Sequence, residues 1–235
     1  MEGGLAKNPR KSIRERIASG DLAGLLKQAV ELHGHYCPGL AFGVRAGYRA
    51  VVELDMHSTG MEEVIAIVET NNCFSDGIQF VTGCTFGNNA LIYRGYGKTA
   101  VTLAKRSGEG IRVYIKTDNN FLEEREPEAM QLFQTVVVNR NGSADDRARL
   151  MELWRQASFS MLDVPDSELL DVRKVTVEIP KYARIFDSVK CSICGESIME
   201  PRARMRNGKP VCIPCSGQEY YQLAGDGICL KQHES

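Results

Sequence analysis

The sequence predicts an α+β fold with a mainly antiparallel sheet and packed helices, followed by a small zinc-ribbon-type domain. Apolar residues recur at helical spacing in several segments, and short stretches of alternating apolar residues indicate strands. Five of the eight cysteines fall in the last fifth of the 235 residues. We therefore expect two domains, a core over residues 1–183 and a cysteine-rich domain over residues 184–235.

Two helices are expected near the N-terminus, on either side of a glycine. Apolar residues recur at helical spacing from about Asp21 and stop at His33, and Gly34 suits a helix end. Pro38 suits the first position of a second helix, because the N–H that it lacks has no helical partner there. Cys37 would then lie at the N-terminus of this second helix.

The expected strands form a sheet with antiparallel neighbours. Residues 64–68, VIAIV, would be apolar on both faces of a strand, which is typical of a central position. Residues 100–105 and 111–116 alternate around a glycine-containing turn, and this pattern predicts a β-hairpin. One more strand is marked by Val175, Val177 and Ile179.

Two further helices are expected after the hairpin. One runs from Glu128 to about Val138, and the other begins at Ser143, an N-cap residue with Asp146 close behind. The core stripe of the second helix is Leu150, Leu153, Trp154, Ala157 and Met161. Residues 78–81 are expected to be a core segment, either helical or extended.

The charge balance excludes a strongly basic protein. Lys and Arg total 29 against 30 Asp and Glu, so no global field attracts nucleic acid or an anionic membrane. No apolar run approaches the roughly 18 residues of a membrane helix, and the first residues lack the apolar stretch of a secretory signal. We expect a cytoplasmic protein with reduced cysteines, which favours metal or redox chemistry over disulfides.

Four of the late cysteines predict a structural zinc site. Cys191, Cys194, Cys212 and Cys215 form two Cys-x-x-Cys pairs, with 17 residues between them. Two thiolates from each pair can complete a tetrahedron around one Zn²⁺ ion. A segment of about 50 residues builds little hydrophobic core, so the metal would supply most of its folding energy. The alternatives are a redox dithiol or four unrelated core cysteines; Cys229 has no assigned role.

Three arginines alternate between the two cysteine pairs. Arg202, Arg204 and Arg206 precede an Asn-Gly turn, and on a strand they would share one face. Such a face could contact phosphate or an acidic partner. Because residues 184–235 hold only seven basic against six acidic side chains, we expect solvated charge there and keep nucleic-acid binding as an alternative.

The stretch from Cys191 to Cys215 resembles the zinc finger of DksA/TraR-type transcription regulators. In those proteins the finger accompanies a helical module that works on RNA polymerase. The resemblance covers about twenty-five residues here, and it implies the zinc fold more than the function.

A second group of metal-binding or nucleophilic residues lies near the N-terminus. His33, His35 and Cys37 fall within five residues, and on an extended segment His35 and Cys37 could share a metal ion. Cys37 at a helix N-terminus could instead be a nucleophile, with His35 or Asp76 as its base. Cys73 and Cys84 are candidates to complete either site. The alternative is that His33 caps a helix and both cysteines are small core residues.

Residues 20–180 resemble the formylmethanofuran dehydrogenase FmdE family, some members of which carry a C-terminal zinc finger. The resemblance rests on three motifs, His33-Gly-His35-Tyr-Cys37-Pro38-Gly39-Leu40-Ala-Phe-Gly43, Glu69-Thr70-Asn-Asn-Cys73-Phe-Ser-Asp76-Gly-Ile78-Gln79-Phe-Val-Thr82-Gly83-Cys84-Thr85-Phe-Gly87-Asn-Asn-Ala-Leu91 and Tyr96-Gly97-Lys98. It implies an α+β core that forms intertwined homodimers, and an association with molybdenum or tungsten formylmethanofuran dehydrogenase. It also implies a metal site or reactive cleft. Its strongest candidates here are His35, Cys37 and Cys73, followed by His33, Asp76, Cys84 and Lys98.

Three functions compete. The first is a metal-binding accessory protein with a second transition-metal ion in the core, which supports a molybdo- or tungstoenzyme partner. The second is a small-molecule enzyme with the Cys37 nucleophile. The third is a metal- or metabolite-sensing regulator whose zinc finger binds nucleic acid or protein.

Overall fold

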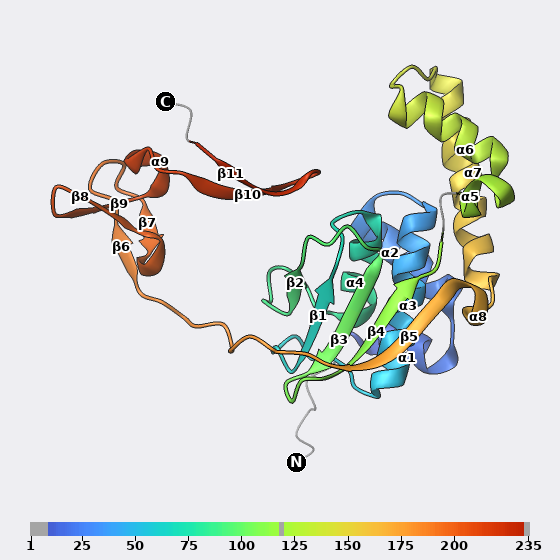
Figure 1. The fold of residues 1–235 in the computed structure, drawn as a ribbon, viewed down its shortest axis with the longest axis horizontal. Helices are drawn as coiled ribbons and strands as arrows, with labels where there is room; N and C mark the ends of the chain where they lie inside the picture. The colour runs from blue at the N-terminus through green and yellow to red at the C-terminus, as the bar shows by residue number, and fades with distance from the viewer. Residues whose placement is uncertain (1–8, 118–119, 233–235) are drawn as a thin grey trace, which may run out of the picture. The chain divides into compact units, whose positions relative to one another are not determined.

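The computed structural model describes residues 9–117 and 120–232, and the chain divides after residue 180 into two units (Figure 1). The first unit contains helices and a five-stranded sheet, and the second contains short antiparallel strands around a cysteine group. The predicted α+β class is confirmed.

Four helices are described between residues 9 and 90. They are α1 (Lys11–Ser19), α2 (Leu22–His33), α3 (Pro38–Leu54) and α4 (Cys73–Thr82). The Asp21 carboxylate accepts a hydrogen bond from the Gly24 N–H at the start of α2, and Gly34 ends that helix with a φ of 93°. The apolar pattern does not predict α1, because its only large apolar residues are Ile13 and Ile17. The segment that could have been helical or extended is part of α4.

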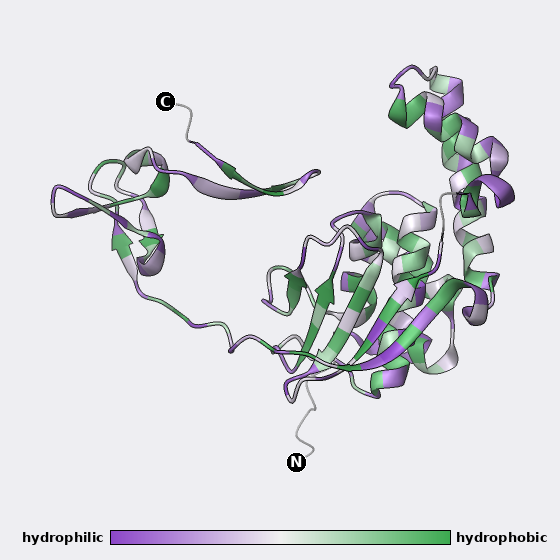
Figure 2. Ribbon diagram, viewed as in Figure 1, coloured by the Kyte–Doolittle hydropathy of each residue, from purple (hydrophilic) through white to green (hydrophobic). Residues whose placement is uncertain are grey.

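The sheet of the first unit has the strand order β2-β1-β3-β4-β5. Its strands are β1 (Val64–Val68), β2 (Leu91–Tyr93), β3 (Ala100–Lys105), β4 (Glu109–Ile115) and β5 (Leu170–Thr176). Strand β2 runs parallel to β1, and all other neighbours are antiparallel. The prediction of a central strand at 64–68 is confirmed, because β1 lies between β2 and β3, is fully buried and is hydrophobic along its length (Figure 2).

The core of the first unit lies between this sheet and the helices. Helix α3 packs on β3 and β4, and α4 packs on β1 (Figure 1). The strand register aligns the apolar side chains that face the helices, with Val101 opposite both Val68 and Val113. Because all three side chains are buried, this row contributes directly to the core.

The last strand of the sheet differs from its predicted position. Strand β5 begins at Leu170, and of the three marker residues only Val175 lies within it. Strand pairing with β4 sets these bounds, because β5 is in register with β4 from Leu170 opposite Ile115 to Thr176. Val177 continues the chain with one hydrogen bond, from its N–H to the Gly108 carbonyl oxygen.

In the sequence, β4 and β5 are connected by a series of helices that we call the arm. It consists of α5 (Phe121–Arg125), α6 (Pro127–Phe133), the π-helix η1 (Gln134–Val138), α7 (Ala144–Asp163) and α8 (Asp166–Leu169). The expected helix at 128–138 is therefore an α-helix that widens into a π-helix. Ser143 and Asp146 form the predicted N-terminal cap of α7 as a full capping box.

A buried arginine of α3 holds the other end of α7. The Arg45 guanidinium donates hydrogen bonds to the carbonyl oxygens of Met161 at 2.9 Å, Leu162 at 2.9 Å and Val164 at 2.7 Å, and it pairs with Asp166. These carbonyls have no helical partner at a helix C-terminus, where the helix dipole also favours a cation. Arg45 thus ties the arm to the helical layer.

The second unit is made of short hairpins. Its elements are β6 (Ser188–Lys190), β7 (Ser197–Met199), the 3₁₀-helix η2 (Glu200–Arg202), β8 (Arg204–Arg206), β9 (Lys209–Val211), α9 (Ile213–Ser216), β10 (Tyr220–Ala224) and β11 (Gly227–Lys231). The predicted Asn-Gly turn is confirmed, with positive φ at Asn207 and Gly208. The expected shared face of three arginines is wrong, because Arg202 lies in η2 and only Arg204 and Arg206 lie on β8.

Among the described residues, no helix is both long and apolar enough to span a lipid bilayer.

Candidate metal centre

Two helix N-termini meet because α3 and α4 cross at glycines. A Cβ atom on Gly43 would lie 2.1 Å from the Phe74 carbonyl oxygen, and one on Gly77 would lie 2.6 Å from the Val44 nitrogen. Both distances are far below van der Waals contact, so only glycine permits this approach. The crossing brings together Cys37, the N-cap of α3, and Cys73, the first residue of α4.

The end of α2 and the loop after it complete a four-residue group. His33 is the last residue of α2, and His35 lies in the connection to α3. The ligand atoms of His33, His35, Cys37 and Cys73 all lie within 4.8 Å of one another. We call these four residues the His/Cys cluster. Two imidazole nitrogens and two sulfurs at this separation match the donor set of a tetrahedral zinc-type site.

Asp76 contacts the cluster through His33. Its carboxylate accepts a hydrogen bond from His33 Nδ1 at 2.8 Å, and the Gln79 amide donates to the other carboxylate oxygen at 3.0 Å. This bond leaves His33 Nε2 directed at Cys37 Sγ, 3.6 Å away. A carboxylate that fixes the tautomer of a histidine is the usual outer partner of a ligating imidazole.

The two sulfurs share one proton. The Cys37 thiol donates to Cys73, which together with nearby His33 lowers the pKa of Cys73 to about 6. The same bond, with burial, raises the pKa of Cys37. The Leu40 N–H donates to Cys37 Sγ at 3.4 Å, as expected for an N-cap sulfur. One thiolate is therefore present at neutral pH in the metal-free cluster, and an ion would displace the second proton.

The His35 ring is partly buried and lies beside two other rings. Burial, and then the nearby His33, lower the pKa of His35 and favour the neutral imidazole that binds metals. Its ring lies 4.4 Å from the His33 ring and 5.8 Å from the Trp154 ring, measured between centroids. Trp154 comes from α7 of the arm. Its place in an apolar helical stripe predicts a core residue, and no sequence signal links it to the cluster.

Besides Asp76, the candidates Cys84 and Lys98 lie outside the cluster, and the expectation that Cys84 completes the site is corrected. Cys84 is fully buried, its sulfur donates to the Val64 carbonyl oxygen at 3.4 Å, and burial raises its pKa to about 11. It is a core thiol because it follows α4, whereas Cys73 begins that helix. Lys98 is exposed, and its backbone N–H donates to the Glu69 carbonyl oxygen after β1.

The structure also changes which histidine could act as the base for a Cys37 nucleophile. His33, and not His35, is the histidine that contacts Cys37 through a hydrogen bond, and Asp76 acts on His33. The sequence alone ranks His33 below His35, because Cys37 and His35 alternate on an extended segment. In the structure, the last turn of α2 places His33 closer to the Cys37 sulfur than the sequence pattern indicates.

The four late cysteines form the second group of ligands. The sulfurs of Cys191, Cys194, Cys212 and Cys215 lie within 4.8 Å of one another. Tight turns follow both cysteine pairs, with φ of 76° at Gly195 and 70° at Gly217. Backbone N–H groups donate to the sulfurs, those of Cys212 and Cys215 at 3.4 Å. This is the geometry of a structural four-thiolate zinc site.

The second unit has little other interior. Of its described residues, only Cys191 and Val211 are buried. A unit with so small a core depends on its metal for a folded state. Cys229 lies outside the ligand group, on β11, where its sulfur donates to the Gln222 carbonyl oxygen at 3.7 Å.

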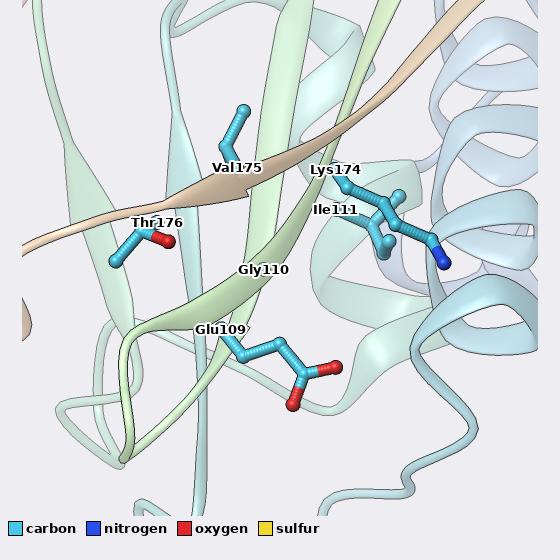
Figure 3. Close-up of a pocket in the computed structure, with 6 residues that line it drawn as sticks. All are labelled: Glu109, Gly110, Ile111, Lys174, Val175 and Thr176. Carbon is cyan, nitrogen blue, oxygen red and sulfur yellow. The ribbon is translucent and has the colours of Figure 1, made fainter.

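A hollow of about 230 Å³ lies along β4 and β5 of the first unit (Figure 3). Its lining residues are Glu109, Gly110, Ile111, Lys174, Val175 and Thr176. None of these is a cysteine or histidine, and none is a candidate from the sequence. This hollow therefore offers no thiolate or imidazole ligand for a metal ion.

Two family models match the chain. One, described as FmdE, molybdenum formylmethanofuran dehydrogenase operon, matches residues 32–171. The other, described as the prokaryotic dksA/traR C4-type zinc finger, matches residues 184–221. Both resemblances expected from the sequence are confirmed.

One relative and one solved structure extend the comparison. A probable S-adenosyl-L-methionine-binding protein of Archaeoglobus fulgidus is 41% identical over 212 residues, which are 88% of this chain and 56% of that protein. The chain thus spans little more than half of this relative. A tungsten formylmethanofuran dehydrogenase FmdE-like protein from Syntrophus aciditrophicus matches with a TM-score of 0.53 and 23% identity, over 83% of this chain and 92% of that chain. At that identity the likeness shows the fold alone.

Proposed function

This chain belongs to the FmdE family, and we propose that it is a metal-binding accessory protein that carries a transition-metal ion at the His/Cys cluster. We further propose that it acts as a homodimer alongside a molybdenum or tungsten enzyme of the formylmethanofuran dehydrogenase type. The family description, which refers to the operon of such an enzyme, supports this second part. The single observation that carries the metal role is the convergence of four ligand atoms within 4.8 Å.

The four donors of the His/Cys cluster favour a role in metal storage or transfer over a role in metal catalysis. Four protein ligands occupy all four coordination positions of a tetrahedral metal ion. Catalytic zinc sites instead keep one position for water or substrate. His35 and Cys73 are partly exposed, so an ion bound there lies near solvent and within reach of a partner or chelator. The cluster therefore suits storage or transfer of a zinc-type ion. Such an ion would link the N-termini of α3 and α4 through Cys37 and Cys73.

Metal content tests the proposal, with the zinc finger as an internal reference. We expect two metal equivalents per chain for the wild type and one for the Cys37→Ala/Cys73→Ala variant. Cys84→Ala is the matched control, because it removes a thiol of the first unit outside the cluster, and it should keep both. Two equivalents in the Cys37→Ala/Cys73→Ala variant would contradict the metal role of the cluster.

A second function has its own observation. Cys37 Sγ lies 3.6 Å from His33 Nε2, and Asp76 orients His33, which is the arrangement of a thiol nucleophile, its base and an orienting carboxylate. In an enzyme of this kind His33 would have to deprotonate Cys37 despite the raised pKa of that thiol, and Cys37 would then be modified before Cys73. If peptide-resolved alkylation of the metal-free chain at pH 7 instead modifies Cys73 first, the nucleophile assignment of Cys37 fails.

A further inference from the structure

The His35 ring is held differently from the other members of the His/Cys cluster. His33 is fixed by its bond to Asp76, and Cys37 accepts the Leu40 N–H. No hydrogen bond among the described residues reaches the His35 ring. Ligating histidines almost always use their second nitrogen for an outer hydrogen bond that sets the ring orientation. The described protein residues therefore contact the His35 ring by packing and not by hydrogen bonding.

Aromatic rings surround His35 instead. The Trp154 indole lies 5.8 Å from the His35 ring with an angle of 24° between the planes, which is a stacked arrangement. The Phe133 ring follows at 5.4 Å from Trp154. These contacts link the cluster to the arm, because Phe133 ends α6 and Trp154 lies on α7.

The position of Trp154 is itself fixed. Its neighbour Leu153 and Ala157, one turn later, are buried, and α7 packs along α3. Arg45 holds the C-terminal carbonyls of the same helix at distances of 2.7 to 2.9 Å. The indole is therefore a rigid surface beside a histidine in a connecting loop.

We infer that Trp154 is a positioning residue of the metal centre, whose stacked indole holds the His35 ring in its liganding orientation. This inference rests on the proposed metal role of the His/Cys cluster. It makes the arm a part of the metal site, since the α7 helix carries the group that orients one ligand. Without the indole, the His35 ring would lose its stacking partner, and the affinity for the metal would fall.

The test measures metal affinity at the cluster of the full chain by chelator competition with Zn²⁺, and ligand geometry from the Co²⁺ absorption spectrum. Trp154→Leu should weaken the cluster about 10- to 100-fold, the effect typical of losing an outer partner. Trp154→Phe keeps a stacking ring and should retain most of the affinity. Met151→Ala, an exposed position one turn earlier on α7, is the control and should change nothing.

A double-mutant cycle separates positioning from general loosening of the fold. In a His35→Ala background, Trp154→Leu should cause no further loss of affinity. An equal loss in both backgrounds, an unchanged affinity in Trp154→Leu, or a Trp154→Phe variant as weak as the leucine variant would each overturn the inference. A wild-type chain that binds metal only at the zinc finger would instead overturn the proposed function itself.

Discussion

The Cα atom of Gly77 lies 3.0 Å from the point that a Cβ atom of Gly43 would occupy. This contact between α3 and α4 is what brings the two cysteine-bearing helix ends together. A side chain at either glycine would collide with the backbone of the other helix. The metal centre therefore depends on two residues that offer it no ligand atom.

Substitution at the crossing should damage both stability and metal binding. Gly77→Ala places a methyl group against the backbone of α3, and overpacking of this kind costs about 1–3 kcal/mol or more. We expect a lower free energy of unfolding, measured by urea denaturation, and loss of the metal of the His/Cys cluster. Gly87→Ala is the control, because nothing lies within 4 Å of its added Cβ atom. A fully stable Gly77→Ala chain with its metal would refute the role given to this crossing.

The outer carboxylate should tune the affinity of the cluster. Asp76→Asn keeps the shape of the side chain but removes the charge that orients and polarises His33. We expect about 10- to 100-fold weaker Zn²⁺ binding at the cluster, measured by chelator competition. Asp145→Asn, at an exposed position in the first turn of α7, should bind metal like the wild type. Equal affinities for the two variants would count against the outer-partner role.

The shared proton makes a pH prediction for the metal-free chain. Cys73 has a pKa lowered to about 6 from an ordinary value of 9.0, so its thiolate form should dominate above pH 6 and disappear as the pH falls below it. Peptide-resolved alkylation with iodoacetamide should follow this titration at Cys73. Cys37→Ala removes the hydrogen-bond donor, so the titration should move toward higher pH. A midpoint that stays in place in Cys37→Ala would show that another group stabilises the thiolate.

Removal of zinc should affect the two units unequally. The second unit has two buried residues among those described, and in zinc-finger peptides the metal supplies roughly 10–16 kcal/mol of folding free energy. Cys191→Ala/Cys194→Ala should therefore abolish amide-exchange protection in residues 188–216, while the sheet of the first unit keeps it. Protection retained in the second unit would mean that its hairpins fold without zinc.

Local signals in the sequence predicted most of the elements. Asp21 and Gly34 bound α2, Pro38 begins α3, and Ser143 with Asp146 begins α7, because helix caps act within a few residues. Errors arose where pairing with a distant strand decides the outcome. Leu170 starts β5 because it meets Ile115, some fifty-five residues earlier in the chain.

The sequence by itself determined the helix ends, the central apolar strand and the cysteine quartet, since each is encoded by neighbouring residues. The tertiary structure alone decided which distant residues share a site. Cys73 and Cys84 both follow β1, but α4 separates them by its length, about 15 Å at 1.5 Å per residue. The Gly43–Gly77 crossing selects Cys73 for the metal centre and leaves Cys84 in the core. Trp154 joins the same site because α7 packs back along α3, a relation that no local pattern records.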